Sequence, residues 1–237
     1  MKKILDPCEA VSHIHDHASI MVGGFMCCGQ ALRLIDELVK KGSKDLTVIC
    51  NDAGFPERGV GRLIVAGQVK RFIASHMGTN PIAGQRMNAG EMEVELVPQG
   101  SLAERIRCGG AGLGGVLTPT GLGTAAEKGK KKLEVNGRKY LLETPLHADF
   151  AFIKAAVCDR HGNACVAKAG KNFNIVMAMA AQHCIVETDT LVEVGGLDPE
   201  LVHIPGVFVD AIAVKKVTAQ GTRSSEGGCS PSPERVA

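Results

Sequence analysis

The sequence predicts an α/β protein with an open, mostly parallel sheet flanked by helices and a small antiparallel hairpin subdomain. Short β-branched segments alternate with helical stretches, which is typical of βαβ units. The chain has 237 residues, 45% hydrophobic and 22% charged, so it can bury a core. An Asn-Gly pair between two alternating segments predicts the hairpin. We expect one domain over residues 1–217 and a disordered tail over 218–237, where apolar periodicity is missing.

The first elements are expected to be a helix, a strand, a glycine loop and a second helix. Asp6-Pro7 is typical of an N-cap followed by N1, and this helix is expected to reach about His15. Residues 19–22 predict a strand that ends at Gly23-Gly24. Apolar residues at helical spacing follow from Leu32, and Gly42 marks the end of that helix.

The next elements continue the same alternation. Strands are predicted at residues 46–50, 69–74 and 94–97, and helices around residues 59–67, 84–87 and 102–108. The glycine-rich run 109–115 is expected to be a loop, and residues 133–141 a hairpin around Asn136-Gly137. Later strands are predicted at 150–155, 184–186 and 208–214, with a helix at 174–182. Such alternation predicts a parallel sheet covered on both faces.

Composition disfavours two classes of partner. The charge sum, 27 Lys and Arg against 25 Asp and Glu, is too even for a nucleic-acid footprint, and aromatic residues are only 3%. No apolar run approaches the ~20 residues that span a bilayer, so we expect no membrane partner. The polar start of the chain, Met1–Pro7, predicts no signal peptide and therefore a cytoplasmic protein. The nine cysteines are scattered along the chain and form no C-x-x-C pair, so we expect no metal site.

The loop Gly23–Gly29 lies where open α/β sheets bind ligands, at the carboxyl end of a strand with backbone N–H groups facing the next helix. It can hold a phosphate or a thioester, or it can be a purely structural turn. It is not a dinucleotide or Walker fingerprint, so nucleotide hydrolysis is disfavoured. Cys27 and Cys28 invite a nucleophile interpretation, but their apolar context and the absence of a nearby paired histidine argue against it.

Two further segments follow strands at the same predicted edge. Ser75-His76 and then Gly78–Pro81 close the third strand, where Asn80-Pro81 can be a turn or a ligand contact. Gln99 follows the fourth strand, and Ser101 with Glu104 predicts a capping box that starts the next helix. A carboxamide N–H held at that corner can bind a developing oxyanion, although a structural role for Gln99 is equally open.

These residues resemble the family I coenzyme A transferases, and within them the alpha-type chain of enzymes that act on acetate, acetoacetate and butyrate. The similarity runs from about residue 8 to residue 215. It is carried by Met21–Met26 with Gly29, Ser75–Pro81, Val97–Arg107, Gly109–Gly115, Thr118–Gly121 and Lys171–Asn174. Ala31 stands where the family has proline, and Lys171 where it has arginine. The second departure replaces the planar guanidinium group of arginine, which carries several N–H donors, with the single ammonium group of lysine.

The resemblance implies a coenzyme A transferase fold, Rossmann-like and three-layered. It also implies a ping-pong exchange of coenzyme A between short-chain carboxylic acids through a glutamyl-CoA thioester. The nucleophilic glutamate belongs to a beta-type chain, in a Ser-Glu-Asn-Gly setting that this chain lacks. The expected assembly has two alpha and two beta chains, with coenzyme A as substrate and no cofactor.

The resemblance also implies roles for particular residues of this chain. Gln99 would be the oxyanion donor. Part of the CoA and acyl pocket would be formed by residues of two loops, namely Gly23, Gly24, Phe25, Met26, Cys27, Cys28, Gly29, Gly78, Thr79, Asn80 and Pro81. Two alternatives stay open: the alpha-type chain of a 3-oxoadipate or other 3-oxoacid CoA-transferase, and a non-catalytic module that binds acyl-CoA.

Overall fold

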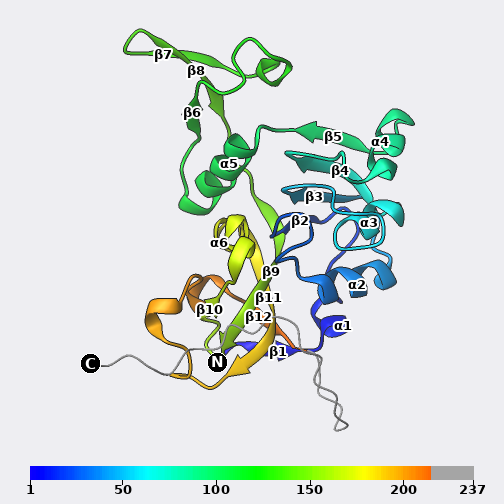
Figure 1. Ribbon diagram of the computed structural model, residues 1–237, viewed down its shortest axis with the longest axis vertical. Coiled ribbons are helices and arrows are strands. Elements are labelled where there is room, and N and C mark those ends of the chain that lie inside the picture. Colours follow the sequence, from blue (N-terminus) through cyan, green and yellow to red (C-terminus); the bar gives the residue numbers. More distant parts are fainter. Residues whose placement is uncertain (215–237) are drawn as a thin grey trace.

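The computed structural model describes residues 1–214, so the predicted tail, 218–237, lies outside the described residues (Figure 1). Nine strands form the main sheet: β1 (Lys3–Leu5), β2 (Ser19–Val22), β3 (Leu46–Cys50), β4 (Val69–Ala74), β5 (Glu93–Leu96), β9 (Ala148–Asp159), β10 (Ala164–Cys165), β11 (Ala181–Val192) and β12 (Ala211–Ala213). The helices are α1 (Pro7–Ala10), α2 (Leu32–Lys41), α3 (Gly61–Val65), α4 (Pro81–Asn88), α5 (Gln99–Ala111) and α6 (Asn174–Met179). Four 3₁₀ turns lie at Ala125–Glu127, Lys168–Asn172, Pro199–Leu201 and Gly206–Phe208.

The main sheet has the order β1-β12-β11-β9-β2-β3-β4-β5, and β10 pairs with β9 at its side. All pairs along this path are parallel, and only the β10–β9 pair is antiparallel. The predicted open, mostly parallel sheet is therefore confirmed. The chain builds outward from β2 to β5 and then returns to β9 on the other side of β2. This reversal is a topological switch point, where open α/β sheets bind ligands.

Helices cover both faces of the sheet, which explains its apolar strands. On one face Ile20, Val48 and Phe72 pack with α1 to α4, and on the other face Met21, Ile49 and Ile73 pack with α5 and α6. Figure 1 shows the two helix layers on opposite sides of the strands. Adjacent strand residues point to opposite faces, so burying both faces requires apolar residues at nearly every position.

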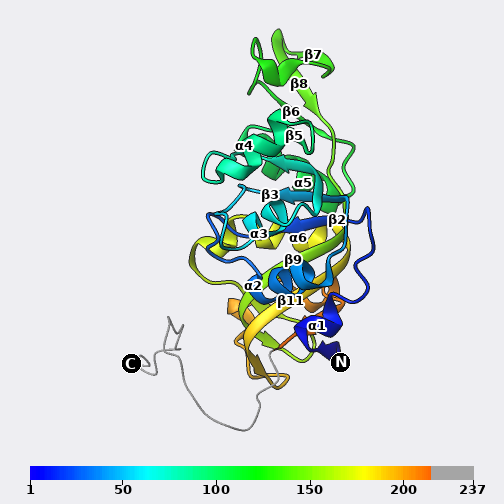
Figure 2. The same cartoon turned by 90° about the vertical axis from the view of Figure 1, so that its right-hand side faces the viewer.

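A three-stranded antiparallel sheet projects from one end of the main body, and both views show it apart from the large sheet (Figures 1 and 2). Its order is β6-β8-β7, with β6 (Val116–Thr118), β7 (Lys132–Val135) and β8 (Arg138–Glu143). Asn136 and Gly137 have φ of 51° and 73°, the positive values of a type I′ turn. The predicted hairpin subdomain is confirmed, with β6 as an additional strand.

Several predicted boundaries are wrong. The first helix ends at Ala10 instead of about His15, so His13 and His15 lie outside it. The glycine run was expected to be a loop, yet α5 continues to Ala111 before Gly112 ends it in the left-handed conformation. A side chain would not fit at this point of the helix, because a Cβ on Gly109 would lie 2.0 Å from the carbonyl oxygen of Leu146. These glycines let the helix approach the neighbouring backbone closely.

One carboxylate joins the starts of β2 and β9. The Asp149 Oδ2 atom accepts hydrogen bonds from the backbone N–H and the hydroxyl of Ser19, both at 2.7 Å. The backbone hydrogen bond from Ser19 is the largest cause that lowers the pKa of Asp149 from its ordinary value. A carboxyl whose folded-state pKa is depressed contributes stability above its unfolded pKa, about 3.9, and loses it as pH falls through the folded-state pKa.

We therefore expect acid to destabilise the protein partly through Asp149. The free energy of unfolding, measured with urea between pH 7 and pH 3, should fall less with decreasing pH in Asp149→Asn than in the parent protein. At pH 7 the variant should be the less stable of the two. If the free energy of unfolding falls equally with decreasing pH in the two proteins, this carboxylate does not contribute to the loss of stability in acid.

Candidate active site

The segments that the sequence predicts as a site meet at the carboxyl edge of β2, β3, β4 and β5. They are the glycine loop (residues 23–29), the loop after β4 (residues 75–81) and the first residue of α5. A fourth segment, the β3 loop (residues 51–59), lies between them and contacts all three. Sequence reasoning missed this central segment, which follows its strand with a polar pair, Asn51-Asp52.

The glycine loop is a tight turn with strained backbone. Phe25 and Cys28 exchange two backbone hydrogen bonds, at 2.9 and 2.8 Å. Between them Met26 and Cys27 have φ of 48° and 64°, values that are uncommon for residues other than glycine. The buried carboxylate of Asp52 accepts the Met26 N–H at 2.8 Å and so helps to hold this conformation. Such strain persists only where surrounding contacts over-determine it.

The β3 loop repeats the pattern of the glycine loop. Residues 24–29 and 54–59 both read Gly-Phe-x-x-x-Gly, and in each the phenylalanine forms an isolated bridge to the third residue after it. The phenylalanines, Phe25 and Phe55, are 40% and 38% exposed. This repeated pattern was the available sequence signal for the β3 loop. The two loops pack together, with the Cys27 thiol 3.3 Å from the carbonyl oxygen of Arg58.

The two cysteines of the glycine loop differ in their surroundings. Cys27 is buried, and burial raises the pKa of its thiol, so the reactive thiolate is disfavoured. Cys28 is exposed, and its backbone is committed to the bridge with Phe25. The burial of Cys27 thus argues against the nucleophile interpretation for that residue.

Gln99 lies at the site edge, but its local structure differs from the prediction. It is the first residue of α5, directly after the N-cap Pro98. The predicted capping box is wrong, because Ser101 is inside the helix and its buried hydroxyl has no hydrogen-bond partner. The Gln99 Nε2 atom donates to the Asn51 Oδ1 atom at 2.6 Å. The side chain remains exposed, so its second N–H can reach a ligand.

The loop after β4 is tied to the β3 loop. Thr79 donates its hydroxyl to the carbonyl oxygen of Gly54 at 2.6 Å. Asn80 caps α4 by accepting the Ile82 N–H at 3.2 Å, and its Nδ2 atom donates to the carbonyl oxygen of Ala53. Both ends of the Asn80 carboxamide are therefore occupied, which favours the turn over the ligand contact. Gly78 is exposed, and Pro81 is the first helical residue of α4.

Asn174 joins the glycine loop to the other half of the sheet. This fully buried side chain accepts the Lys154 N–H at 2.9 Å and donates to the carbonyl oxygens of Gly29 and Gly170, both at 2.8 Å. A Cβ on Gly23 would lie 2.0 Å from its Oδ1 atom, and a Cβ on Gly29 would lie 2.5 Å from the Gly170 Cα atom. Glycine is required at both positions by close packing.

A cavity of about 330 Å³ opens beside this junction, near the switch point between β2 and β9. Cys28 and Gly29 line it together with Lys154, Lys168 and Asp189. The Lys154 Nζ atom lies 2.7 Å from the Asp189 carboxylate. Burial alone would raise the pKa of Asp189, but the hydrogen bond from Lys154 and the positive charges of Lys154 and Arg33 lower it. The cavity therefore joins two predicted pocket residues to the Lys154–Asp189 ion pair and to Lys168.

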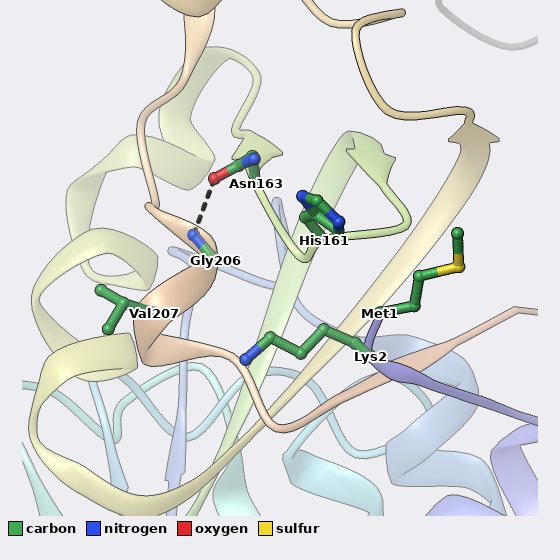
Figure 3. Close-up of a pocket in the computed structure, with 6 residues that line it drawn as sticks. All are labelled: Met1, Lys2, His161, Asn163, Gly206 and Val207. Carbon is green, nitrogen blue, oxygen red and sulfur yellow. Dashed lines mark hydrogen bonds between the residues drawn. The ribbon is translucent and has the colours of Figure 1, made fainter.

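A cavity of about 370 Å³ elsewhere contains none of the predicted site residues (Figure 3). It is lined by Met1, Lys2, His161, Asn163, Gly206 and Val207. Its polar contact is internal, since the Asn163 Oδ1 atom accepts the Gly206 N–H at 2.9 Å.

Within residues 1–214, no helix combines the length and the apolar character needed to cross a bilayer.

Comparison with known proteins identifies the family to which this chain is similar. Residues 5–215 match the family model described as Coenzyme A transferase. The chain is 50% identical over 214 residues to the alpha subunit of the acetate CoA-transferase from Escherichia coli K12, covering 90% of this chain and 97% of that protein. It is 52% identical over 201 residues to the alpha subunit of the acetoacetyl-CoA:acetate/butyrate CoA transferase from Clostridium acetobutylicum, covering 85% and 92%.

A solved structure shows the same fold. The acyl-CoA transferase YdiF of Escherichia coli O157:H7, in a thioester complex with CoA, superposes with a TM-score of 0.79 at 25% identity. The match covers 90% of this chain and 47% of that one, so this chain spans about half the length of that protein chain.

Proposed function

Since the chain belongs to the coenzyme A transferase family, we propose that it is the alpha subunit of an enzyme that moves coenzyme A between short-chain carboxylic acids. The observation that carries this proposal is the 50% identity to the alpha chain of an acetate CoA-transferase, which extends over 97% of that protein. The glycine loop and Gln99, on which the resemblance depends, lie at one edge of the sheet. The substrates we propose are acetate with acetoacetyl-CoA or butyryl-CoA.

The proposed reaction needs a nucleophile from a second chain. A glutamate carboxylate of the beta chain adds to the thioester carbonyl, and the CoA thiolate leaves, which produces a mixed anhydride. The thiolate then attacks the glutamyl carbonyl and releases the first acid as its carboxylate, leaving a glutamyl-CoA thioester. The second acid reverses both steps. Coenzyme A is thus a substrate, and no resident cofactor is required.

Negative charge develops on the carbonyl oxygen in each addition step. A donor aimed at that oxygen stabilises the transition state more than the uncharged thioester, and so raises kcat. Gln99 is suited to this role, because its carboxamide is neutral, exposed and anchored on the first turn of α5. The glycine loop and the loop after β4 would form the wall of the CoA and acyl pocket beside it.

We propose an assembly of two alpha and two beta chains in the cytoplasm. The relatives named above are alpha subunits, which implies a partner subunit in those proteins. The chain of the acyl-CoA transferase YdiF is about twice as long as the part that this chain matches. A separate beta chain supplying the rest of such an enzyme would account for that difference.

Reconstitution tests the proposal. The purified chain alone should not transfer CoA from acetoacetyl-CoA to acetate, and addition of a beta-type chain should restore transfer. Turnover by the alpha chain alone would contradict the shared active site. A panel of acids, including 3-oxoadipate, then ranks substrates by kcat/KM, because one methylene changes binding by only ~1 to 3 kcal/mol. If the pair binds CoA but never transfers it, the chain is a binding module instead.

A further inference from the structure

The geometry points to Asn51 as a positioning residue that makes Gln99 present an N–H group, and not its carbonyl oxygen, to the substrate. The inference rests on the proposed function, in which Gln99 is a hydrogen-bond donor. It concerns a residue that neither the motifs nor the family resemblance single out. Asn51 is 2% exposed and lies directly after β3, between the glycine loop and α5.

The orientation begins at Asp52, which is completely buried. Its carboxylate accepts the Met26 N–H at 2.8 Å through Oδ2 and the Gly54 N–H at 2.9 Å through Oδ1. Backbone N–H groups can only donate, and a carboxylate can only accept. Two rigid backbone donors therefore hold this group in place, and they belong to the two Gly-Phe-x-x-x-Gly loops.

Asp52 in turn orients the side chain of Asn51. The Asn51 Nδ2 atom donates to Asp52 Oδ2 at 2.7 Å. A reversed Asn51 amide would place its oxygen against the carboxylate, where neither atom can donate. The Asn51 Oδ1 atom must consequently face away from Asp52. The Ser75 hydroxyl lies 2.7 Å from the Asn51 carbonyl oxygen and 3.2 Å from Oδ1, and its one proton can be donated to either.

Asn51 orients the Gln99 side chain in the same way. The Asn51 Oδ1 atom is an acceptor, so the Gln99 carboxamide must direct its NH₂ group toward it, at 2.6 Å. One N–H is used in this bond. Within residues 1–214, the Gln99 side chain makes no other hydrogen bond, which leaves the second N–H for the substrate oxygen. A glutamine without this partner could turn its carbonyl oxygen toward the substrate. The partial negative charge of that oxygen would then repel the negative charge that develops on the substrate oxygen.

This chain of contacts also joins the donor to the strained glycine loop. The carboxylate that orients Asn51 holds Met26 at a φ of 48°. A displacement of Asp52 would therefore disturb the pocket wall and the donor together. Misplacement of a catalytic group by about 1 Å can cost on the order of 100-fold in rate.

A double-mutant cycle in the assembled alpha–beta enzyme tests the inference. Asn51→Ala should lower kcat by on the order of 10- to 100-fold, with KM for acetate changed much less. In the Gln99→Ala background the same substitution should change kcat by less than about twofold, because there is no donor left to orient. Gln68→Ala is the matched control. It removes a buried carboxamide that donates to Leu38 and Ser43, and it should leave kcat unchanged.

Equal loss of kcat in both backgrounds would overturn the positioning role, while the proposed function would survive. If Gln99→Ala itself leaves kcat unchanged, the donor role fails first and the positioning role fails with it. Should Asn51→Ala not fold, Asn51→Leu replaces it in the cycle. That substitution roughly keeps the size of the side chain and removes the acceptor of the Gln99 N–H, so kcat should fall only where Gln99 is present. Melting temperatures of all variants separate loss of fold from loss of orientation.

Discussion

Gln99→Ala in the assembled enzyme is expected to lower kcat by ~10²- to 10³-fold, the loss typical of removing one oxyanion donor. The side chain is exposed and makes a single hydrogen bond within the described residues, to Asn51, so the variant should assemble normally. KM for acetate should change little, because the interaction strengthens only as charge develops on the oxygen. Steady-state kinetics of the reconstituted enzyme measures both constants.

Two further variants separate the N–H donor from the shape of Gln99. Gln99→Glu keeps the length of the side chain but replaces the donor with an acceptor, so its kcat should be at least as low as that of the alanine variant. Gln85→Ala removes an exposed glutamine from α4 and should behave like the parent enzyme. Unchanged turnover in Gln99→Ala would remove Gln99 from the mechanism.

Gly23→Ala is expected to destabilise the protein by about 2 to 3 kcal/mol, as overpacking in a filled core does. Its Cβ would lie 2.0 Å from the Asn174 Oδ1 atom and 3.0 Å from the Asn174 Cα atom, so the rotation of one side chain cannot relieve the contact. Displacing Asn174 would also break its hydrogen bonds to Gly29 and Gly170. Urea unfolding measures the loss of stability, and transfer activity should fall with it.

The control for this prediction is another glycine-to-alanine change. Gly84 lies inside α4, and a Cβ built on it has nothing within 4 Å. Gly84→Ala should therefore raise the free energy of unfolding by up to about 1 kcal/mol, because alanine favours a helix over glycine. Equal stability of Gly23→Ala and the parent protein would show that the junction between the glycine loop and Asn174 adjusts without cost.

The fold class and the position of the site edge could be predicted because both depend on local patterns. Alternating β-branched strands and helices specify a parallel sheet, and the carboxyl ends of parallel strands meet at one edge. Gly23–Gly29, Gly78–Pro81 and Gln99 are therefore found at the same edge. Whether they bind coenzyme A stays a prediction, which the reconstituted enzyme and its variants test.

The boundaries that were wrong depend on contacts between distant segments. Gly109 resembles a loop residue in sequence, yet it lies within α5, where the Leu146 carbonyl oxygen occupies the space of a side chain. Ser101 and Glu104 have capping-box spacing, but the helix already begins after Pro98. Local sequence preference ranks possible helix ends, and packing against the rest of the chain selects among them.

The α/β architecture, the hairpin at Asn136-Gly137 and the family can be predicted from the chain alone, because they follow from periodicity, turn chemistry and long matching strings. The contacts from Asp52 to Asn51 and from Asn51 to Gln99, which spans 48 positions of sequence, become visible only in the folded protein. The physical reason is that a hydrogen bond depends on the direction of donor and acceptor in space. That direction is set when neighbouring strands pair and bring their ends together.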